Sequence, residues 1–431
     1  MIRKLFFNTR TKQKLIFLLA TAAAFLFVFG FSSCKSNSSP HKFTIWTDRE
    51  EIVSYTELFN SLHDDVKAVV IYKQHLSRSL PPARDEEKPD LLIGSYLKTE
   101  NMRRFFRKLD SVFSTDAIDP QIFYTSLLEY GRANNAQYLL PVSFNLPVVI
   151  FSVKNEYLVP QQLFIEIDEI RDTASEFNEK NSSGFYVKMG FSPSWDAEFI
   201  YTVAKMNGLD FAEKRGSFNW NSHNLSRTVN YIKMWTEENN TSTEAEQDFA
   251  FKYLYTPKYR QVSSSRCLYA YATAKDVFGA TFPDDLDFRW LTKSGTLFAE
   301  DDFATLGIYK GARNPDGARL FIIWLLNEDS QRKILERKTS MRLDTETFGI
   351  AAGFSSLKSV NEQILPIYYK NLLGNIPQQS AILPPSTFPA RWESLKERVI
   401  IPYLTEAVKT TQSKNFKTIE DLLKTWKNQF D

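Results

Sequence analysis

Aromatic and polar side chains stand at the predicted ends of strands and helices, where an α/β protein exposes its loops. Trp46 and Tyr96 lie at the ends of predicted strands, Asp48 follows one, Trp195 lies in a strand-to-helix loop, and Trp392 begins a predicted helix. Ligands of open α/β sheets bind beyond the carboxyl ends of the strands. Flat rings can stack on the C–H faces of a sugar, and planar polar groups can hydrogen-bond its hydroxyls. These five residues are therefore our candidates for binding a small polar ligand.

No motif typical of catalysis or metal binding accompanies them. The four histidines lack metal-ligand spacing, and neither a zinc-protease, a nucleophile-elbow nor a Walker-type glycine motif occurs. The two cysteines, Cys34 and Cys267, cannot form a disulfide framework or a cysteine-based zinc cluster. We interpret the run from Glu300 to Asp302 as a solvated acidic loop, because no glycine or further carboxylate completes a calcium-binding loop. The sequence predicts a protein without catalytic residues, metal or cofactor.

Length and charge limit the class of protein further. The chain has 431 residues, of which 43% are apolar, and single hydrophobic cores stop growing near roughly 250–300 residues. Two domains are therefore expected. The 53 basic and 51 acidic residues are interleaved along the chain and give a net charge of +2. This distribution lacks the basic stripe of a nucleic-acid-binding protein.

The N-terminus has the pattern of a targeting segment. Basic residues precede an uninterrupted apolar run from Leu15 to Phe31, which ends in Ser32, Ser33 and Cys34. This end resembles the lipobox of bacterial lipoproteins, in which the cysteine is acylated and becomes the new N-terminus. We therefore assign residues 1–33 to a lipoprotein signal peptide and 34–41 to a polar tether. The alternative is an uncleaved membrane anchor, because 17 apolar residues are about the minimum that spans a bilayer.

Strand and helix patterns alternate along the remaining chain, which favours parallel sheets flanked by helices. The predicted strands include 42–47, 67–72, 90–96, 185–189, 266–272 and 303–309. The predicted helices include 52–62, 102–109, 121–131, 163–178, 196–207, 225–235, 315–326, 392–407 and 418–430. Asn314 suits the capping position of the helix after the last strand, and Pro315 its first turn. The pattern indicates an α/β protein with a helical C-terminal part.

Two stretches carry a resemblance to a known family. The first, Tyr138 to Val153, has two prolines between β-branched and aromatic runs, as expected of two buried strands joined by a stiff connection. The second runs from Phe303 to Gln331 and includes the spacing Asn314, Pro315, Ala318, Phe321, Trp324 and Leu325. Both resemble corresponding parts of bacterial extracellular solute-binding proteins of the maltose-binding type, the receptors of ABC importers.

The resemblance implies a two-lobe periplasmic-binding-protein-like fold of type II, in which each lobe has a mixed sheet flanked by helices and three hinge crossovers join the lobes. The first lobe would contain residues 42–144 and 290–327, and the second 145–289 and 328–431. A third crossover would fall near residues 327–330. The resemblance also places Asn145 at the bottom of the ligand cleft, which adds it to the five candidates above.

The family implies a membrane-tethered lipoprotein that captures a sugar or oligosaccharide by cleft closure and delivers it to ABC permease subunits. We expect a monomer outside the cytoplasm, in the periplasm or at the cell surface, that binds no nucleic acid. A second class is a ligand sensor or surface-interaction lipoprotein on the same fold. A third is a secreted enzyme acting on glycans, although no carboxylate pair is singled out by its context.

Overall fold

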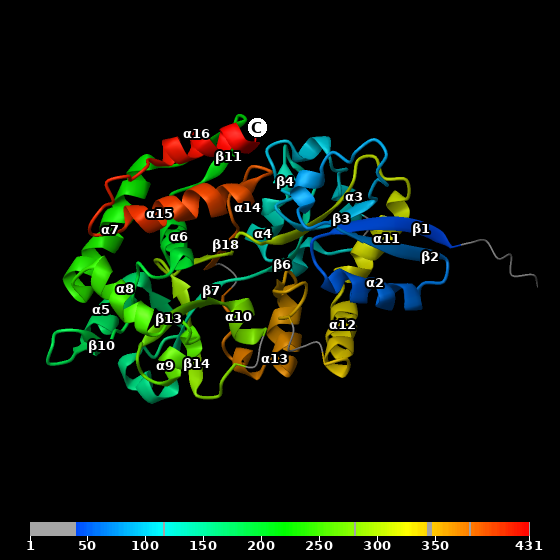
Figure 1. Ribbon diagram of the computed structural model, residues 1–431. Coiled ribbons are helices and arrows are strands. Elements are labelled where there is room, and N and C mark those ends of the chain that lie inside the picture. The colour runs from blue at the N-terminus through cyan, green and yellow to red at the C-terminus, as the bar shows by residue number, and fades with distance from the viewer. Residues whose placement is uncertain (1–39, 115–116, 280–281, 343–346, 379–380, 431) are drawn as a thin grey trace, which may run out of the picture. The chain divides into compact units, whose positions relative to one another are not determined.

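The computed structural model describes residues 40–114, 117–279, 282–342, 347–378 and 381–430 (Figure 1). The predicted signal peptide 1–33, the lipidation candidate Cys34 and most of the predicted tether lie outside these ranges. Residues 42–431 form one unit. Across the described ranges, none of the helices combines the length and hydrophobicity needed to cross a bilayer.

One sheet has six strands in the order β17-β6-β16-β3-β1-β2. Strand β1 is parallel to β3, whereas β16 is antiparallel to both β3 and β6, so the sheet is mixed. The strand predicted at 303–309 is β16, and it lies between strands that precede it by more than 150 residues. The bounds are β1 His41–Thr47, β2 Val66–Tyr72, β3 Leu91–Ser95, β6 Leu140–Phe144, β16 Ala304–Ile308 and β17 Phe354–Ser355.

Alternation along β1 assigns its side chains to the two faces of this sheet. Phe43 and Ile45 belong to the core under helices α2 (Glu51–Leu62) and α11 (Pro315–Leu325). Phe59 of α2 and Phe321 of α11 have ring centroids 5.1 Å apart, so the two helices share one face. Trp46 belongs to a smaller cluster on the other face, with Leu76, Leu92 and Met102 among its members.

The second sheet has four strands in the order β13-β7-β14-β8. Strand β7 is antiparallel to both β13 and β14, and β8 is parallel to β14. Its residues also alternate between two apolar clusters, since Val149 and Phe151 join one cluster and Val148 and Ile150 the other. The bounds are β7 Pro147–Ser152, β8 Phe164–Glu166, β13 Tyr269–Thr273 and β14 Leu286–Thr292.

The remaining elements are short strand pairs and helices. The strand pairs are β4 (Arg132–Ala133) with β5 (Ala136–Gln137), β9 (Glu179–Lys180) with β10 (Tyr186–Lys188), β11 (Ala212–Lys214) with β12 (Ser217–Asn219), and β15 (Leu297–Phe298) with β18 (Ile382–Leu383). The helices are α3 Asp110–Ser114, α4 Thr125–Tyr130, α5 Ile167–Phe177, α6 Ala197–Met206, α7 Ser222–Asn240, α8 Thr243–Lys252, α9 Lys258–Ser263, α10 Ala274–Phe278, α12 Glu328–Ser340, α13 Leu365–Tyr368, α14 Trp392–Leu395, α15 Ile401–Ala407 and α16 Ile419–Phe430.

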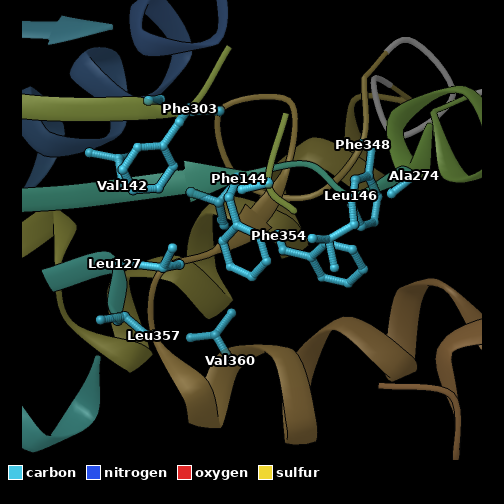
Figure 2. Packing of buried hydrophobic residues seen from close by; sticks show 14 of the residues in the cluster. Leu127, Val142, Phe144, Leu146, Ala274, Phe303, Phe348, Phe354, Leu357 and Val360 are labelled. Atoms are coloured by element: carbon cyan, nitrogen blue, oxygen red, sulfur yellow. The ribbon is translucent and has the colours of Figure 1, made fainter. Parts of the chain in front are cut away.

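The stretch with two prolines joins the two sheets. Strand β6 belongs to the six-stranded sheet, and after Asn145 and Leu146 the chain continues as β7 of the four-stranded sheet. Figure 2 shows Phe144 and Leu146 pointing into an apolar cluster that includes Phe354, Phe348 and Leu357. The rings of Phe144 and Phe354 stack with centroids 5.6 Å apart. The predicted pair of buried strands is confirmed.

Three predicted helices differ from the structure, and of 121–131 only Thr125–Tyr130 is α-helix, after a 3-10 turn at Pro120–Ile122. The segment 102–109 is helical only as a three-residue 3-10 turn, Met102–Arg104, because no side chain caps it and Phe106 instead bridges to Tyr309. The predicted helix 163–178 begins late, at Ile167, because Phe164–Glu166 pairs with β14 as strand β8. Glu166 then forms a capping box with Glu169, which fixes the start of α5.

Other local predictions are confirmed. The Asn314 side chain accepts a hydrogen bond from the Gly317 N–H and caps α11, with Pro315 in its first turn. Asn327 caps α12 in the same way. Strand β17, which lies beyond that point in the chain, still pairs with β6. The expected crossover near residues 327–330 therefore falls before the last strand of the six-stranded sheet, and the domain boundaries stay a prediction.

Candidate ligand-binding site

A cavity of about 360 Å³ lies where the ends of elements from both sheets meet. Tyr96 follows β3 of the six-stranded sheet, whereas Tyr271 belongs to β13 of the four-stranded sheet. Acidic residues between β15 and β16 and charged residues from the first turns of α6 and α9 complete the wall. The lining residues are Tyr96, Asp196, Glu198, Lys258, Tyr271, Ala272, Thr273, Lys275, Asp276, Glu300, Asp301, Asp302 and Lys396.

Asp301 is the most connected side chain of this wall. Its Oδ2 accepts hydrogen bonds from the Tyr201 hydroxyl at 2.6 Å and the Trp392 indole N–H at 3.0 Å. Its Oδ1 lies 3.1 Å from the Lys205 ammonium, and Lys396 is 3.9 Å from Oδ2. Burial acts to raise the pKa of Asp301, but the two lysines and the two hydrogen bonds hold it below its ordinary value. Asp301 is therefore ionised at neutral pH.

Asp302 connects this wall to the end of β1. Its carboxylate lies 3.0 Å from the Lys275 ammonium, and its backbone oxygen accepts a hydrogen bond from the Arg49 guanidinium. Arg49 also donates to the hydroxyl of Ser95 at the end of β3. Burial acts against ionisation, but Lys275 and Arg49 hold the pKa of Asp302 below its ordinary value. These contacts join four separate parts of the chain at one edge of the site.

Glu300 has weaker partners than its two neighbours. Glu300 is 8% exposed. Its carboxylate accepts a hydrogen bond from the Tyr271 hydroxyl at 3.3 Å and lies 3.9 Å from the Lys205 ammonium. Lys205 is closer to Asp301, so Glu300 shares a cation that is already paired. Burial raises the pKa of Glu300 despite Lys205. The interpretation of residues 300–302 as a solvated acidic loop is wrong, because the hydrogen bonds and lysines described above allow the run to be buried.

Asp48 lies beside this network. Its Oδ2 accepts a hydrogen bond from the Ser95 N–H at 3.0 Å, whereas its buried Oδ1 has no hydrogen-bond partner among the described residues and lies 3.5 Å from Arg49 Nε. Burial raises the pKa of Asp48 to about 6, against the opposing effect of Arg49. The Asp48 carboxylate can lie this close to the backbone of β3 only because residue 94 is glycine. A Cβ at that position would lie 2.2 Å from Asp48 Oδ1.

Asn145 lies between the two sheets and is 3% exposed. Its backbone oxygen accepts a hydrogen bond from the Glu300 N–H at 2.9 Å, and its side-chain amide donates to the Ala352 oxygen at 2.8 Å. The side-chain Oδ1 is buried without a hydrogen-bond partner in the described part of the chain. Asn145 thus ties the β6–β7 connection to the acidic wall and keeps one acceptor unused.

The three candidate tryptophans occupy different environments. Trp46 is fully buried beneath Leu76 and Met102, because alternation along β1 turns it to the face that these residues cover. Trp392, 1% exposed, stacks on Phe388 with ring centroids 4.3 Å apart. Trp195 is partly exposed and lines an adjoining cavity of about 30 Å³, which shares Asp196, Lys258 and Tyr271 with the larger one. Only Tyr96 among the candidate aromatics lines the larger cavity.

Of the candidate residues, the structure thus places Asp48, Tyr96 and Asn145 at or beside the acidic wall. Trp392 joins them through the hydrogen bond from its indole N–H to Asp301. Sequence reasoning missed the basic partners of the site, namely Arg49, Lys205, Lys275 and Lys396. A usable signal was present: three carboxylates in a row directly precede a buried strand, and buried carboxylates require cations nearby. Nothing in the local sequence indicates which lysines supply them.

Several polar contacts join loops that follow strands of one sheet to segments packed on the other. The Glu100 carboxylate accepts hydrogen bonds from the backbone N–H groups of Arg215 and Gly216 at 2.7 and 2.8 Å. The Ser77 hydroxyl donates to the Ala390 oxygen at 2.9 Å. We call these the rim contacts.

The fold is shared with solved sugar-receptor structures. A cyclo/maltodextrin-binding protein complexed with maltotetraose is 14% identical, with a TM-score of 0.60 over 92% of this chain and 99% of that one. An ABC substrate-binding protein from Listeria monocytogenes in complex with cycloalternan is 13% identical, with a TM-score of 0.57 over 90% and 98%. The galacto-N-biose/lacto-N-biose I-binding protein of an ABC transporter from Bifidobacterium longum is 12% identical, with a TM-score of 0.57 over 90% and 96%.

These similarities establish the fold class that the sequence predicted, a two-lobe binding-protein fold with mixed sheets flanked by helices. No family model matches the sequence. No curated protein matches it either. At these identities the likeness shows the fold, and the function has to be argued from the site.

Proposed function

We propose that this protein is a substrate-binding receptor that captures a sugar or oligosaccharide between its two lobes and delivers it to an ABC importer. The observation that carries the proposal is the cavity of about 360 Å³, which is walled by residues from both sheets. Its carboxylates, ammonium groups and tyrosines are hydrogen-bonding partners suited to hydroxyl groups. The structural neighbours with the same fold are receptors solved with oligosaccharides.

The proposal assigns roles to the candidate residues. Asp48, Tyr96 and Asn145 would supply hydrogen bonds, since Asp48 and Asn145 each keep a buried oxygen without a hydrogen-bond partner among the described residues. Trp195 would stack on a part of the ligand that extends beyond the cavity. Trp46 and Trp392 are buried, so a role in stacking would require the lobes to open.

A ligand screen tests the proposal. Mono- and oligosaccharides are added to the purified protein, and the thermal unfolding midpoint is followed. A one-site ligand at 100 times its dissociation constant stabilises the folded state by about 2.7 kcal/mol, which is readily measured. A shift with peptides or polyamines but with no sugar would contradict the sugar assignment while leaving a receptor function standing.

We also propose that Cys34 carries the lipid anchor and that the body lies outside the cytoplasm. The apolar run ending at Cys34 and the polar tether behind it support this assignment. Several acyl chains on one residue would hold the protein stably, since each buried CH₂ contributes about 0.8 kcal/mol. Metabolic labelling with a radioactive fatty acid should mark the parent protein and leave Cys34→Ala unlabelled. Label persisting in the variant would contradict the assignment.

The importer role is distinguished from a sensor role by the neighbouring genes. Two genes for multi-spanning permeases beside this one support delivery to an importer, and a gene for a chemoreceptor or kinase in their place supports a sensor. Co-purification of the protein with the permease pair is the direct test. Absence of the complex in the presence of ligand would contradict the delivery step.

A further inference from the structure

The wall of the cavity contains more acidic than basic groups. Six carboxyl groups and three ammonium groups line it, although the whole chain carries a net charge of +2. Each of the three lysines has a carboxylate partner in the same wall: Lys258 pairs with Asp196, Lys275 with Asp302, and Lys396 with Glu198. All three lysines of the wall are therefore paired with a carboxylate, and three carboxyl groups of the wall lie outside these three pairs.

Two of the remaining carboxyl groups also have their own partners. Asp301 is paired with Lys205 at 3.1 Å and accepts the two hydrogen bonds described above. Asp276 accepts hydrogen bonds from the backbone N–H and the hydroxyl of Thr273, at 2.9 and 2.7 Å, and so caps α10. Glu300 is the group left over, with a long contact to Tyr271 and a cation that it shares.

We propose that the ligand carries a positive charge that pairs with Glu300, as the ammonium group of an amino sugar does. This inference rests on the proposed function, because it names the class of sugar that the same cavity binds. A carboxylate buried with incomplete pairing destabilises its surroundings, and an ammonium group would relieve this by supplying both charge and donors. A neutral sugar hydroxyl would supply one donor and no charge.

The neighbouring carboxylates strengthen the argument. Asp301 and Asp302 follow Glu300 in the chain, and their charges are balanced by cations that already face them, Lys205 for Asp301 and Lys275 with Arg49 for Asp302. These cations are therefore engaged, and the charge of Glu300 would attract a ligand cation and repel an anionic ligand. Because burial raises the pKa of Glu300, a bound ammonium group would lower this pKa again and release a proton wherever Glu300 is partly protonated before binding.

A matched set of oligosaccharides tests the inference. Chitosan, chitin and cello-oligosaccharides of equal length share one β-1,4-linked backbone and carry an ammonium, an acetamido or a hydroxyl group at C2. Titration calorimetry on the full processed protein in detergent should give chitosan oligomers an affinity about tenfold or more above the other two. Hydrogen bonds to charged groups exceed neutral ones by roughly that factor. Raised salt should weaken only the chitosan complex.

Two variants locate the charge. Glu300→Gln removes the charge and keeps the shape, and should reduce the affinity for chitosan oligomers about tenfold more than it reduces the affinity for the neutral oligomers. Glu397→Gln is the matched control, because Glu397 is exposed, does not line the cavity and changes the net charge equally. Proton release by the parent protein, measured in two buffers of different ionisation enthalpy, gives a test that does not depend on a variant folding.

The outcomes separate this inference from the proposed function. Neutral oligosaccharides that bind as tightly as the chitosan oligomers, or tighter, overturn the charge inference and leave the sugar receptor standing. Binding of spermidine with no sugar bound overturns the sugar receptor and the amino-sugar assignment together. If none of these probes or the wider sugar screen binds, both proposals are overturned. Equal losses in Glu300→Gln and Glu397→Gln also overturn the pairing with Glu300.

Discussion

The two sides of the β6–β7 connection have opposite character. Phe144 and Leu146 point into an apolar cluster with Phe354, as Figure 2 shows. Asn145, between them, binds the Glu300 N–H through its backbone oxygen and so borders the charged wall. The apolar side is held by packing, which has no direction and little dependence on pH or salt. The charged side is held by specific pairs, each of which depends on its partner.

This difference shows how one short segment can serve both stability and binding. A packed cluster resists deformation, so it can keep the connection in place while the lobes carry the ligand-binding groups. A charged wall with one poorly paired carboxylate costs stability and leaves that group ready for a ligand. Four variants test whether the two sides behave as differently as this comparison requires.

Truncation on the apolar side should have the largest effect. Phe354→Ala should lower the free energy of unfolding by about 3–5 kcal/mol, the range for a large aromatic removed from a packed core. Phe354 is 1% exposed and contacts the rings of Phe144 and Phe348 at centroid distances of 5.6 and 4.9 Å. Urea unfolding at several pH values measures the loss. A loss that varies strongly with pH would contradict a purely apolar role for this side.

Removing the charge of Asp301 should lower the free energy of unfolding by a smaller amount that depends on pH. Asp301→Asn keeps an acceptor for Tyr201 and Trp392 but loses the charge that faces Lys205. The loss should be about 1.5–3 kcal/mol at neutral pH, the range for hydrogen bonds to charged groups.

The pH dependence of that loss has a defined sign. Because the pKa of Asp301 is lowered in the folded protein, its contribution is present above the unfolded pKa and disappears as the pH falls through the folded value. Asp284→Asn serves as the control, since Asp284 is exposed and outside the cavity wall. Equal losses in the two variants would show that the wall is not held by its pairs.

Substitution of Asp48 should change stability in the opposite direction to substitution of Asp301. Its pKa rises from 3.8 to about 6 on folding, so the folded protein holds this proton more tightly, and ionisation costs stability as the pH rises through that window. Asp48→Asn should therefore stabilise the protein above about pH 6, by up to about 3 kcal/mol, and leave it unchanged near pH 3.8. Denaturant titrations at the two ends of the window measure the difference, and a variant less stable at the upper end would contradict the prediction.

The rim contacts should contribute least to stability. Glu100→Ala removes an exposed acceptor of two backbone hydrogen bonds and should cost no more than about 1 kcal/mol, because exposed polar contacts are largely compensated by water. Thermal unfolding without ligand measures this cost. A loss comparable to that of Phe354→Ala would show that the rim, rather than the packed cluster, holds the protein together.

Much of the fold could be predicted because its signals are local. Runs of apolar, β-branched and aromatic residues predicted β1, β3, β6, β7 and β16, and Asn314 with Pro315 predicted the start of α11. The misread helix 163–178 shows the limit of such signals. Phe164–Glu166 forms a strand only because it pairs with β14, which lies more than 120 residues later in the chain. Pairing between distant segments overrides local propensity there.

The site was less predictable because burial and pairing arise from distant residues. Tyr96 lines the cavity because it follows the end of a strand, a position that can be predicted locally, and its role in binding stays a prediction. The burial of Trp392 depends on Phe388, Tyr201 and Asp301, and only Phe388 is close in sequence. The acidic run was read as solvated because its cations lie at Lys205, Lys275 and Lys396, on three separate segments.

The rim contacts also bear on the time that a ligand spends in the protein. Glu100 accepts hydrogen bonds from two backbone N–H groups, and Ser77 donates one to the Ala390 oxygen, so these contacts tie together segments that are distant in the chain. Under the proposed receptor function, we expect a ligand to enter or leave only when such contacts break. Their loss should therefore raise the association and dissociation rate constants together and leave the equilibrium affinity nearly constant. In the proposed transport cycle these few hydrogen bonds would then set the residence time of the cargo.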